Sequence, residues 1–199
     1  MSRLGWLAHG VEPDSNAAEL AARLPGVTVY RCTLEDAGLP SNHFDAITLN
    51  HVIEHLDTPD RTLREIARVL KPGGTVVVTT PNIAGRGHRR FRSNWYHLDL
   101  PRHAVMFSPQ SLQSLTTACG LKMRDLFTIG RQVEQTYLAS GLIARNGHIP
   151  GFFSGSNAAP FKDRLAASWF ALRSSSADAA REGEEIVIVL SKDINNPLV

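Results

Sequence analysis

Residues 44–81 of the chain, FDAITLNHVIEHLDTPDRTLREIARVLKPGGTVVVTTP, decide its fold. Two short apolar runs in this stretch, 44–49 and 75–80, are typical of strands that are buried on both faces. Between them, Thr58-Pro59 predicts a capped helix start, and Lys71-Pro72-Gly73-Gly74 predicts the helix end and a turn. Strand, helix and strand within so short a stretch predict a βαβ unit with a right-handed crossover.

Weaker signals on both sides continue this α/β pattern. Further strands are predicted at 7–11, 27–31, 121–129 and 185–190, and further helices at 15–24, 109–119, 132–145 and 162–173. The chain has 199 residues, of which 43% are hydrophobic and 20% charged. This length and composition predict a single soluble domain, residues 1–199, with its own core.

Composition excludes several classes of protein. The net charge of +2 does not indicate nucleic acid or a membrane surface as a partner. Cys32 and Cys119 form neither a disulfide framework nor a metal motif, which favours a reducing, cytoplasmic setting. The sequence shows no apolar signal region and no run that approaches a membrane span.

An ordered set of motifs resembles the class I S-adenosylmethionine-dependent methyltransferases, especially the subgroup of ubiquinone-biosynthesis O-methyltransferases. The set comprises an FD-led strand ending in a polar dipeptide, an EH pair, a Pro-led helix, KPGG, VVVTTP, VEPD at 11–14, and PRH and FSP within 101–109. The resemblance is specific through about Leu121. It implies a Rossmann-like, mostly parallel sheet with an antiparallel last strand between its two predecessors, S-adenosylmethionine as cofactor and a small-molecule acceptor.

One part of the family's pattern is missing. The family's first strand ends in a glycine-rich loop, roughly G-x-G-x-G, whose backbone approaches the methionine part of the cofactor. Gly5 and Gly10 do not form such a loop. We therefore expect this sequence to be N-terminally truncated relative to the family, by about 30–40 residues. A fragment, a misplaced gene start and a genuinely short protein are all open explanations.

The missing strand is central in the family's sheet, so its absence leaves two strand edges unpaired. We expect one of two repairs. Either the strands on the two sides of the gap pair directly, or the chain forms a homo-oligomer through the exposed edges.

The resemblance implies cofactor contacts at the ends of three strands. Glu12 would accept the ribose hydroxyls, and otherwise is a surface acid before a helix. Leu34 would pack on the adenine face, with Glu35 replacing the acid that the family carries at the position of Thr33. An ordinary charged loop is the alternative for this segment.

Asn50 and His51 follow the strand at 44–49, where open α/β sheets bind their ligands. The family places the methionine end of the cofactor and the substrate there. His51 and His103 are the candidate bases toward a substrate hydroxyl, because imidazole titrates near neutral pH. A loop histidine that only binds backbone is the alternative for His51.

His51, Glu54 and His55 form H-x-x-E-H, which also occurs in a class of metallopeptidases. Some ubiquinone-type relatives carry E-x-x-E-H here and bind a divalent cation. His51 replaces the first of those acids, and no third ligand stands out in the sequence. We therefore predict no metal, and expect Glu54 and His55 to orient the loop.

Residues 82–107 combine arginines with aromatic residues and are predicted to be a substrate lid. Its arginines suit an anionic substrate; a solvated loop and, more remotely, a nucleic-acid surface are the alternatives. Residues 130–183 are predicted to be a mostly helical and loop insertion before the last strand.

The sequence therefore predicts a methyltransferase that acts on an oxygen of a small metabolite, quinone precursor or sugar. An inactive methyltransferase-like fragment or scaffold is the main alternative, since the glycine-rich loop is absent. A nucleotide-binding oxidoreductase is a second alternative, because Glu12 also suits NAD, and the metallopeptidase is a third.

Overall fold

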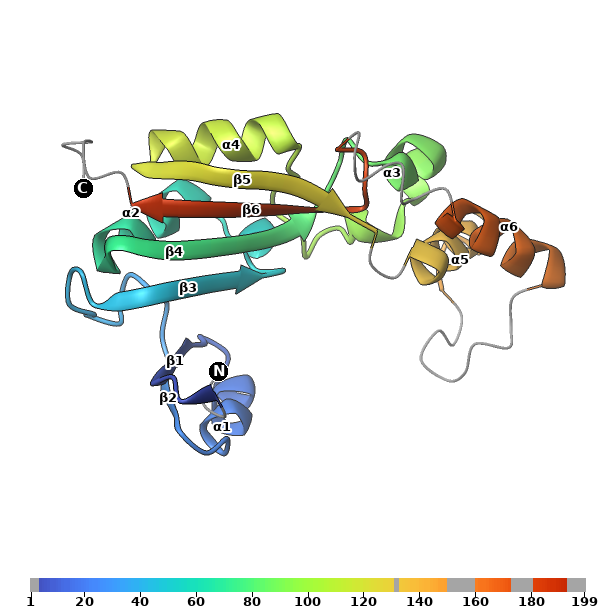
Figure 1. Ribbon diagram of the computed structural model, residues 1–199. Coiled ribbons are helices and arrows are strands. Elements are labelled where there is room, and N and C mark those ends of the chain that lie inside the picture. Colours follow the sequence, from blue (N-terminus) through green and yellow to red (C-terminus); the bar gives the residue numbers. More distant parts are fainter. Residues whose placement is uncertain (1–3, 131–132, 150–159, 173–180, 193–199) are drawn as a thin grey trace.

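The computed structural model describes residues 4–130, 133–149, 160–172 and 181–192 (Figure 1). The elements in chain order are β1 (Ala8–Val11), α1 (Ser15–Ala22), β2 (Val27–Tyr30), β3 (Phe44–Asn50), η2 (Ile53–His55), α2 (Pro59–Val69), β4 (Leu70–Pro81), α3 (Arg86–Phe91), η3 (Arg92–Asn94), η4 (Tyr96–Leu98), α4 (Pro109–Ala118), β5 (Leu121–Ile129), α5 (Val133–Asn146), α6 (Phe161–Leu172) and β6 (Glu185–Lys192).

Four strands form the main sheet in the order β3-β4-β6-β5. β3 and β4 are parallel, with Leu49 opposite Val78, and they confirm the predicted βαβ unit. β6 is antiparallel to both of its neighbours. Its Ile188 pairs with Val78 of β4 on one side and with Leu126 of β5 on the other. The Rossmann-like sheet and its inserted antiparallel last strand are therefore confirmed.

The hydrophobic core lies between this sheet and helices α2 and α4. Leu63 and Ile66 of α2 and Leu112 of α4 are fully buried against Val76 and Ile188 of the sheet. Helix α4 begins with a capping box between Ser108 and Ser111. In α2, Leu63, Ile66 and Ala67 stand at helical spacing and are all buried, so the apolar spacing predicts the buried face of this helix.

Two details of the central unit differ from prediction. Thr58 occupies the N-cap position of α2 but makes no side-chain capping hydrogen bond, since its backbone is not in the usual extended conformation. β4 starts at Leu70 rather than Thr75, because residues 71–74 continue the strand past a register shift opposite Phe44. Gly73 makes this possible by adopting a φ of 79°.

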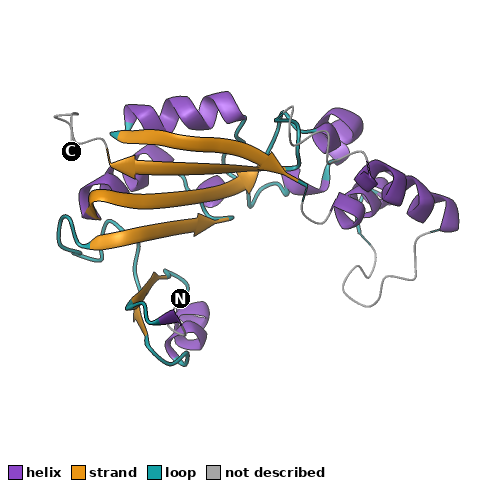
Figure 2. Ribbon diagram, in the orientation of Figure 1, coloured by secondary structure: helices purple, strands orange, loops and turns teal. Residues whose placement is uncertain are grey.

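β1 and β2 form a separate two-stranded parallel sheet, with Gly10 opposite Val29 (Figure 2). Direct pairing of β1 with β3, one of the two predicted repairs, is wrong for the residues described. The small unit instead reaches the main body through His9, whose ring lies 5.4 Å from that of Phe44. Self-association through the open edges stays a prediction.

Helices α5 and α6 correspond to the two helices predicted before the last strand and lie at one end of the main sheet (Figure 1). They pack on each other through Tyr137 and Phe170, and α5 also contacts Phe91 of α3. Residues 131–132, 150–159 and 173–180 of the predicted 130–183 insertion lie outside the described residues. Among the helices described, none is long and apolar enough to cross a bilayer.

Candidate functional site

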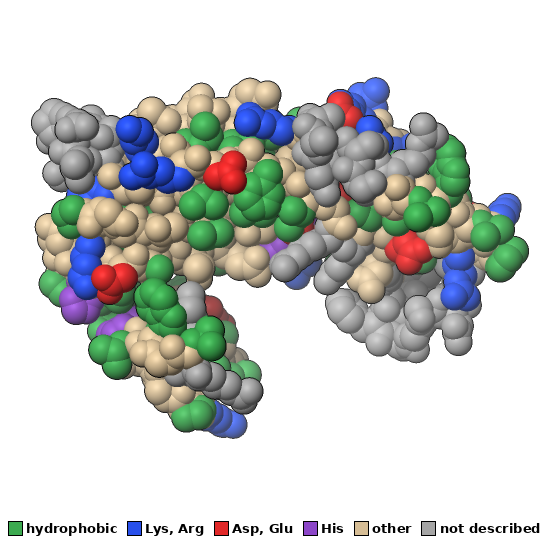
Figure 3. Space-filling model, in the orientation of Figure 1, with side chains coloured by type: hydrophobic (Ala, Val, Ile, Leu, Met, Phe, Trp, Pro, Cys, Tyr) green, Lys and Arg blue, Asp and Glu red, His purple; other side chains and the backbone are tan. Residues whose placement is uncertain are grey.

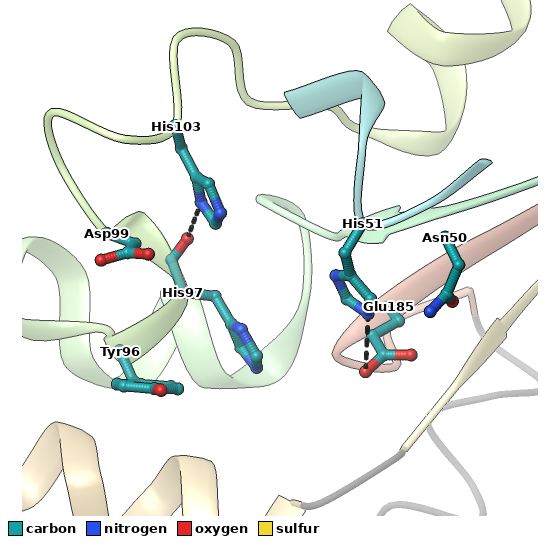
Figure 4. Close-up of a pocket in the computed structure, with 7 residues that line it drawn as sticks. All are labelled: Asn50, His51, Tyr96, His97, Asp99, His103 and Glu185. Atoms are coloured by element: carbon teal, nitrogen blue, oxygen red, sulfur yellow. Dashed lines mark hydrogen bonds and ion pairs between the residues drawn. The ribbon is translucent and has the colours of Figure 1, made fainter. Parts of the chain in front are cut away.

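A pocket of about 330 Å³ opens at the carboxyl end of β3 (Figure 4). Its lining residues are Asn50, His51, Tyr96, His97, Asp99, His103 and Glu185. They come from the end of β3, from the 82–107 segment and from the start of β6. The topology predicts this position, since ligands of open α/β sheets bind at the carboxyl ends of parallel strands.

His51 sits between two acids in this pocket. Its backbone has a φ of 53° and donates its N–H to Thr79, which turns the side chain away from the strand. Nε2 lies 3.6 Å from Glu185 Oε1, and Nδ1 lies 3.1 Å from Glu54 Oε1. The carboxylates of Glu185 and then Glu54 outweigh partial burial and raise the pKa of His51 to about 9. His51 is therefore a cation at neutral pH.

Glu54 joins this pair from η2. Burial pushes the pKa of Glu54 up, but hydrogen bonds from His51, from its own backbone and from Thr80 outweigh burial and leave the pKa lowered. Its second oxygen accepts from Thr80 Oγ1 at 3.0 Å. Both oxygens of this fully buried carboxylate are thus used to fix the turn that carries His51.

His97 and His103 form the opposite side of the pocket. Burial lowers the pKa of His97 to about 4, so its ring is neutral, and Nε2 lies 3.1 Å from Thr136 Oγ1 of α5. His103 is buried and its Nδ1 donates to the backbone carbonyl of His97 at 2.8 Å (Figure 4). This hydrogen bond does not use the other ring nitrogen of His103, Nε2.

Three of the nearby side chains could each offer one ligand atom to a metal ion. Ligand atoms of Glu54, His55 and His103 lie within 4.8 Å of one another. His55 Nδ1 is directed at the backbone carbonyl of Arg102, at 2.9 Å. Because both Glu54 oxygens already have partners, the absence of a metal stays our prediction.

Glu184 holds the 82–107 segment against the start of β6. One of its oxygens accepts from Gly87 N at 2.7 Å, and the other accepts from Trp95 Nε1 at 3.0 Å. A Cβ at Gly87 would lie 2.1 Å from Glu184 Oε2, so any larger residue there would have to displace this carboxylate. Burial raises the pKa of Glu184, while these two hydrogen bonds oppose the rise.

Most of the arginines in this segment are not turned to the pocket. Arg86 and Arg89 both pair with Glu182, at 3.1 and 2.8 Å, and Arg102 pairs with Asp99. The polar lining of the pocket comes instead from the part of the segment that follows Trp95. The positions of these arginines do not support the prediction of an anionic substrate.

The residues predicted to hold the cofactor differ in how free their side chains are. Glu12 Oε1 accepts from Asp14 N at 2.9 Å, which leaves Oε2 for a ligand among the residues described. Asn50 is exposed at the end of β3. Leu34, however, packs against the hydrophobic core, and Glu35 Oε1 accepts from Thr62 at 2.6 Å.

Sequence reasoning missed Tyr96, His97, Asp99 and Glu185 as pocket residues. The sequence predicts Glu185 only as the first residue of a buried strand. A charged residue directly before an apolar run is the feature that could have marked it as a pocket residue. Tyr96, His97 and Asp99 lie in the predicted lid, but spacing along an irregular segment does not tell which side chains face inward.

Comparison with known proteins places residues 1–126 in a methyltransferase domain family. Over 85 residues the chain is 38% identical to a ubiquinone biosynthesis O-methyltransferase of Bradyrhizobium sp., a match that covers 41% of this chain and 34% of that protein. The matched stretch thus spans about a third of the relative's length.

Solved structures share the fold across nearly the whole chain. A methyltransferase of Thermotoga maritima, described as a possible histamine N-methyltransferase, matches with a TM-score of 0.58 at 23% identity over 93% of this chain and 72% of its own. A phosphoethanolamine N-methyltransferase of Haemonchus contortus in complex with S-adenosyl-L-methionine matches with a TM-score of 0.60 at 17% identity, over 96% of this chain and 44% of its own. Family model, motifs and fold agree, and this chain belongs to the class I S-adenosylmethionine-dependent methyltransferases.

Proposed function

We propose that this chain transfers a methyl group from S-adenosylmethionine to an oxygen of a small metabolite, quinone precursor or sugar bound in the 330 Å³ pocket. The observation that supports the proposal best is the position of His103, which lines this pocket in a member of the family. His103 Nδ1 is tied to a backbone carbonyl, so its Nε2 is the atom that can accept a proton from a hydroxyl.

Glu12 would hold the ribose of the cofactor, and Asn50 and His51 would lie beside its methionine end. Bound S-adenosylmethionine supplies an electrophilic methyl group on its sulfonium. The chain then has to align the acceptor oxygen with that methyl group, which can contribute about 7–11 kcal/mol where alignment is good. Residues 82–107 would act as the substrate lid, since their Tyr96–His103 part lines the pocket.

We assign proton acceptance to His103 rather than His51. His51 is already protonated at neutral pH, because two carboxylates raise its pKa to about 9. It can instead orient Glu185 and the turn after β3. His51 is thus a positioning residue in this proposal.

Calorimetric titration of the purified chain with S-adenosylhomocysteine tests cofactor binding. We expect a micromolar Kd, weakened about tenfold by Glu12→Gln, which removes a charge-assisted acceptor for the ribose. Glu19→Gln, in an exposed acid on α1, is the matched control and should leave the Kd unchanged. Absence of binding by the unaltered chain would contradict the proposal.

An inactive scaffold is the second candidate, favoured because β1 and β3 do not pair in one sheet in the described residues. It predicts S-adenosylhomocysteine binding without methyl transfer, or neither. Incubation with radiolabelled S-adenosylmethionine and a panel of hydroxylated acceptors separates the two candidates. Transfer that is lost in His103→Gln but retained in His148→Gln, an exposed histidine after α5, would support the enzyme.

A further inference from the structure

Helix α5 presents a buried polar face to the segment that forms one side of the pocket. Thr136, Ala139 and Ser140 share this face, because they stand three and four residues apart on the helix. Their side chains are 4%, 0% and 0% exposed. α5 contacts η4, which carries the pocket residues Tyr96 and His97.

Two hydrogen bonds join this face of α5 to the pocket wall. Ser140 Oγ accepts from the backbone N–H of Tyr96 at 2.9 Å and donates to the carbonyl of Thr136 at 2.7 Å. Thr136 Oγ1 lies 3.1 Å from Nε2 of His97. Because Thr136 and Ser140 are buried, water cannot replace a partner that is lost here, so each bond holds the wall firmly.

His97 carries this constraint on to His103. The backbone carbonyl of His97 accepts from Nδ1 of His103 at 2.8 Å. Both histidines and Tyr96 lie on the side of the pocket opposite Asn50 and His51 (Figure 4). A shift of η4 would therefore move the proposed proton acceptor together with the wall. A misplacement of about 1 Å near the reacting atoms can cost about a hundredfold in rate.

The two sides of the pocket thus rest on different parts of the chain. Asn50 and His51 end β3, within the residues 1–126 that match the family model. The opposite side is held by α5 (Val133–Asn146), which lies outside the matched residues. The part of the chain that holds the second side is therefore not the part that identifies the family.

We infer that Thr136 and Ser140 are positioning residues of the acceptor site, which hold Tyr96 and His97 against the pocket and, through His97, hold His103. Neither residue lines the pocket, so both act through others. This inference rests on the proposed function, because His103 is the proton acceptor in that proposal. It assigns the alignment of the methyl acceptor in part to α5.

Two substitutions of Thr136 separate hydrogen bonding from packing. Thr136→Val nearly keeps the volume of the side chain but removes the hydroxyl, whereas Thr136→Ser keeps the hydroxyl and removes a methyl group. A positioning role predicts that valine is the damaging change, and a space-filling role predicts that serine is. Thr116→Val is the matched control, because Thr116 is buried in α4 and its hydroxyl donates to Gln113 of its own helix.

The ring nitrogens of His97 report the contact directly. Their signals are measured by nitrogen-15 NMR at pH 7 and assigned with His97→Asn. Thr136→Val should shift them, because it removes the hydroxyl that lies beside Nε2, while Thr136→Ser and Thr116→Val should leave them in place. His97 signals that are the same in Thr136→Val as in the unaltered chain would overturn the inference.

Methyl transfer reports the effect on the acceptor. The probes are catechol, benzyl alcohol and glucose, incubated separately with radiolabelled S-adenosylmethionine. Thr136→Val should lower kcat for a methylated probe at least tenfold and leave the Kd for S-adenosylhomocysteine unchanged, since only the acceptor side is disturbed. Thr136→Ser should keep most of kcat, and Thr116→Val all of it. A kcat that serine lowers more than valine does would overturn the inference.

Ser140→Ala tests the second contact. It leaves the backbone N–H of Tyr96 without its acceptor and should raise the KM for the same probe about tenfold. An unchanged KM would contradict the role of Ser140. Thermal unfolding of every variant establishes that it is folded before it is assayed.

The two measurements distinguish this inference from the proposed function. A shift of the His97 signals in Thr136→Val, with no methyl transfer to any probe by the unaltered chain, would support the contact and contradict the function. Methyl transfer that is equal in the unaltered chain, Thr136→Val and Ser140→Ala would support the function and contradict the role of α5.

Discussion

The main sheet and the small β1–β2 sheet both contain a parallel strand pair with a helix between its strands, yet they bury very different amounts of side chain. Val76 and Val78 of β4 and Ile188 of β6 are inaccessible to solvent. In the described part of the first thirty residues, Ala18 is the only buried side chain. Leu7 and Leu20 are 91% and 61% exposed.

This difference separates the two halves of the proposed site. Every residue that lines the pocket belongs to the main sheet or to segments that pack on it. Glu12, the proposed ribose contact, belongs to the small unit, and the molecular surface is hollowed between that unit and the α5–α6 end (Figure 3). The acceptor side of the site should therefore be more stable than the cofactor side.

The same substitution in each sheet tests this comparison most strongly. Val78→Ala leaves a cavity in the closed core and should lower the free energy of unfolding by about 2–3 kcal/mol. Val29→Ala in β2 should cost less than about 1 kcal/mol, because that side chain is only partly buried. Urea unfolding measures both changes. Equal losses would mean that the two sheets share one core.

Replacing Gly87 tests how firmly the 82–107 segment is fixed to the main sheet. Gly87→Ala places a methyl group against the carboxylate of Glu184, so we expect a loss of about 1–3 kcal/mol. Gly141→Ala in α5 is the control, because a Cβ there meets nothing closer than 3.9 Å. The control should gain up to about 1 kcal/mol from its lower unfolded-state entropy. A Gly87→Ala variant with the same free energy of unfolding as the unaltered chain would show that Glu184 does not hold the 82–107 segment firmly.

The main sheet could be predicted from sequence because its signals are local and agree with one another. The strand at 44–49, the apolar face of α2 and the run at 185–190 each have one consistent interpretation. The position of Leu34 could not be predicted, because it depends on how a loop folds back on the core. The place of Glu185 in the pocket could not be predicted either, since the pocket is lined by the end of β3, the 82–107 segment and the start of β6.

The pH dependence of stability on the acid side gives the smallest effect, and it tests the electrostatics of the pocket. The groups that face His97 are Thr136 from α5, Glu185 from β6, His51 after β3, Glu54 from η2, and Asp99 and His103 from its own segment. Burial lowers the pKa of His97 to about 4, so below its unfolded value of about 6.5 the unfolded chain binds a proton that the folded chain does not. Stability should fall by about 1 kcal/mol between pH 6.5 and 5.5.

His51 acts in the opposite direction. Its folded pKa is raised to about 9, so the stability it contributes is fully present below about pH 6.5 and is lost as pH rises through 9. The two histidines together predict a maximum near pH 6.5 in urea midpoints. His97→Asn should flatten the acid side only and His51→Asn the alkaline side only. A variant that changes both sides equally would mean that the two rings titrate as one coupled unit, because each lies within the field of Glu54 and Glu185.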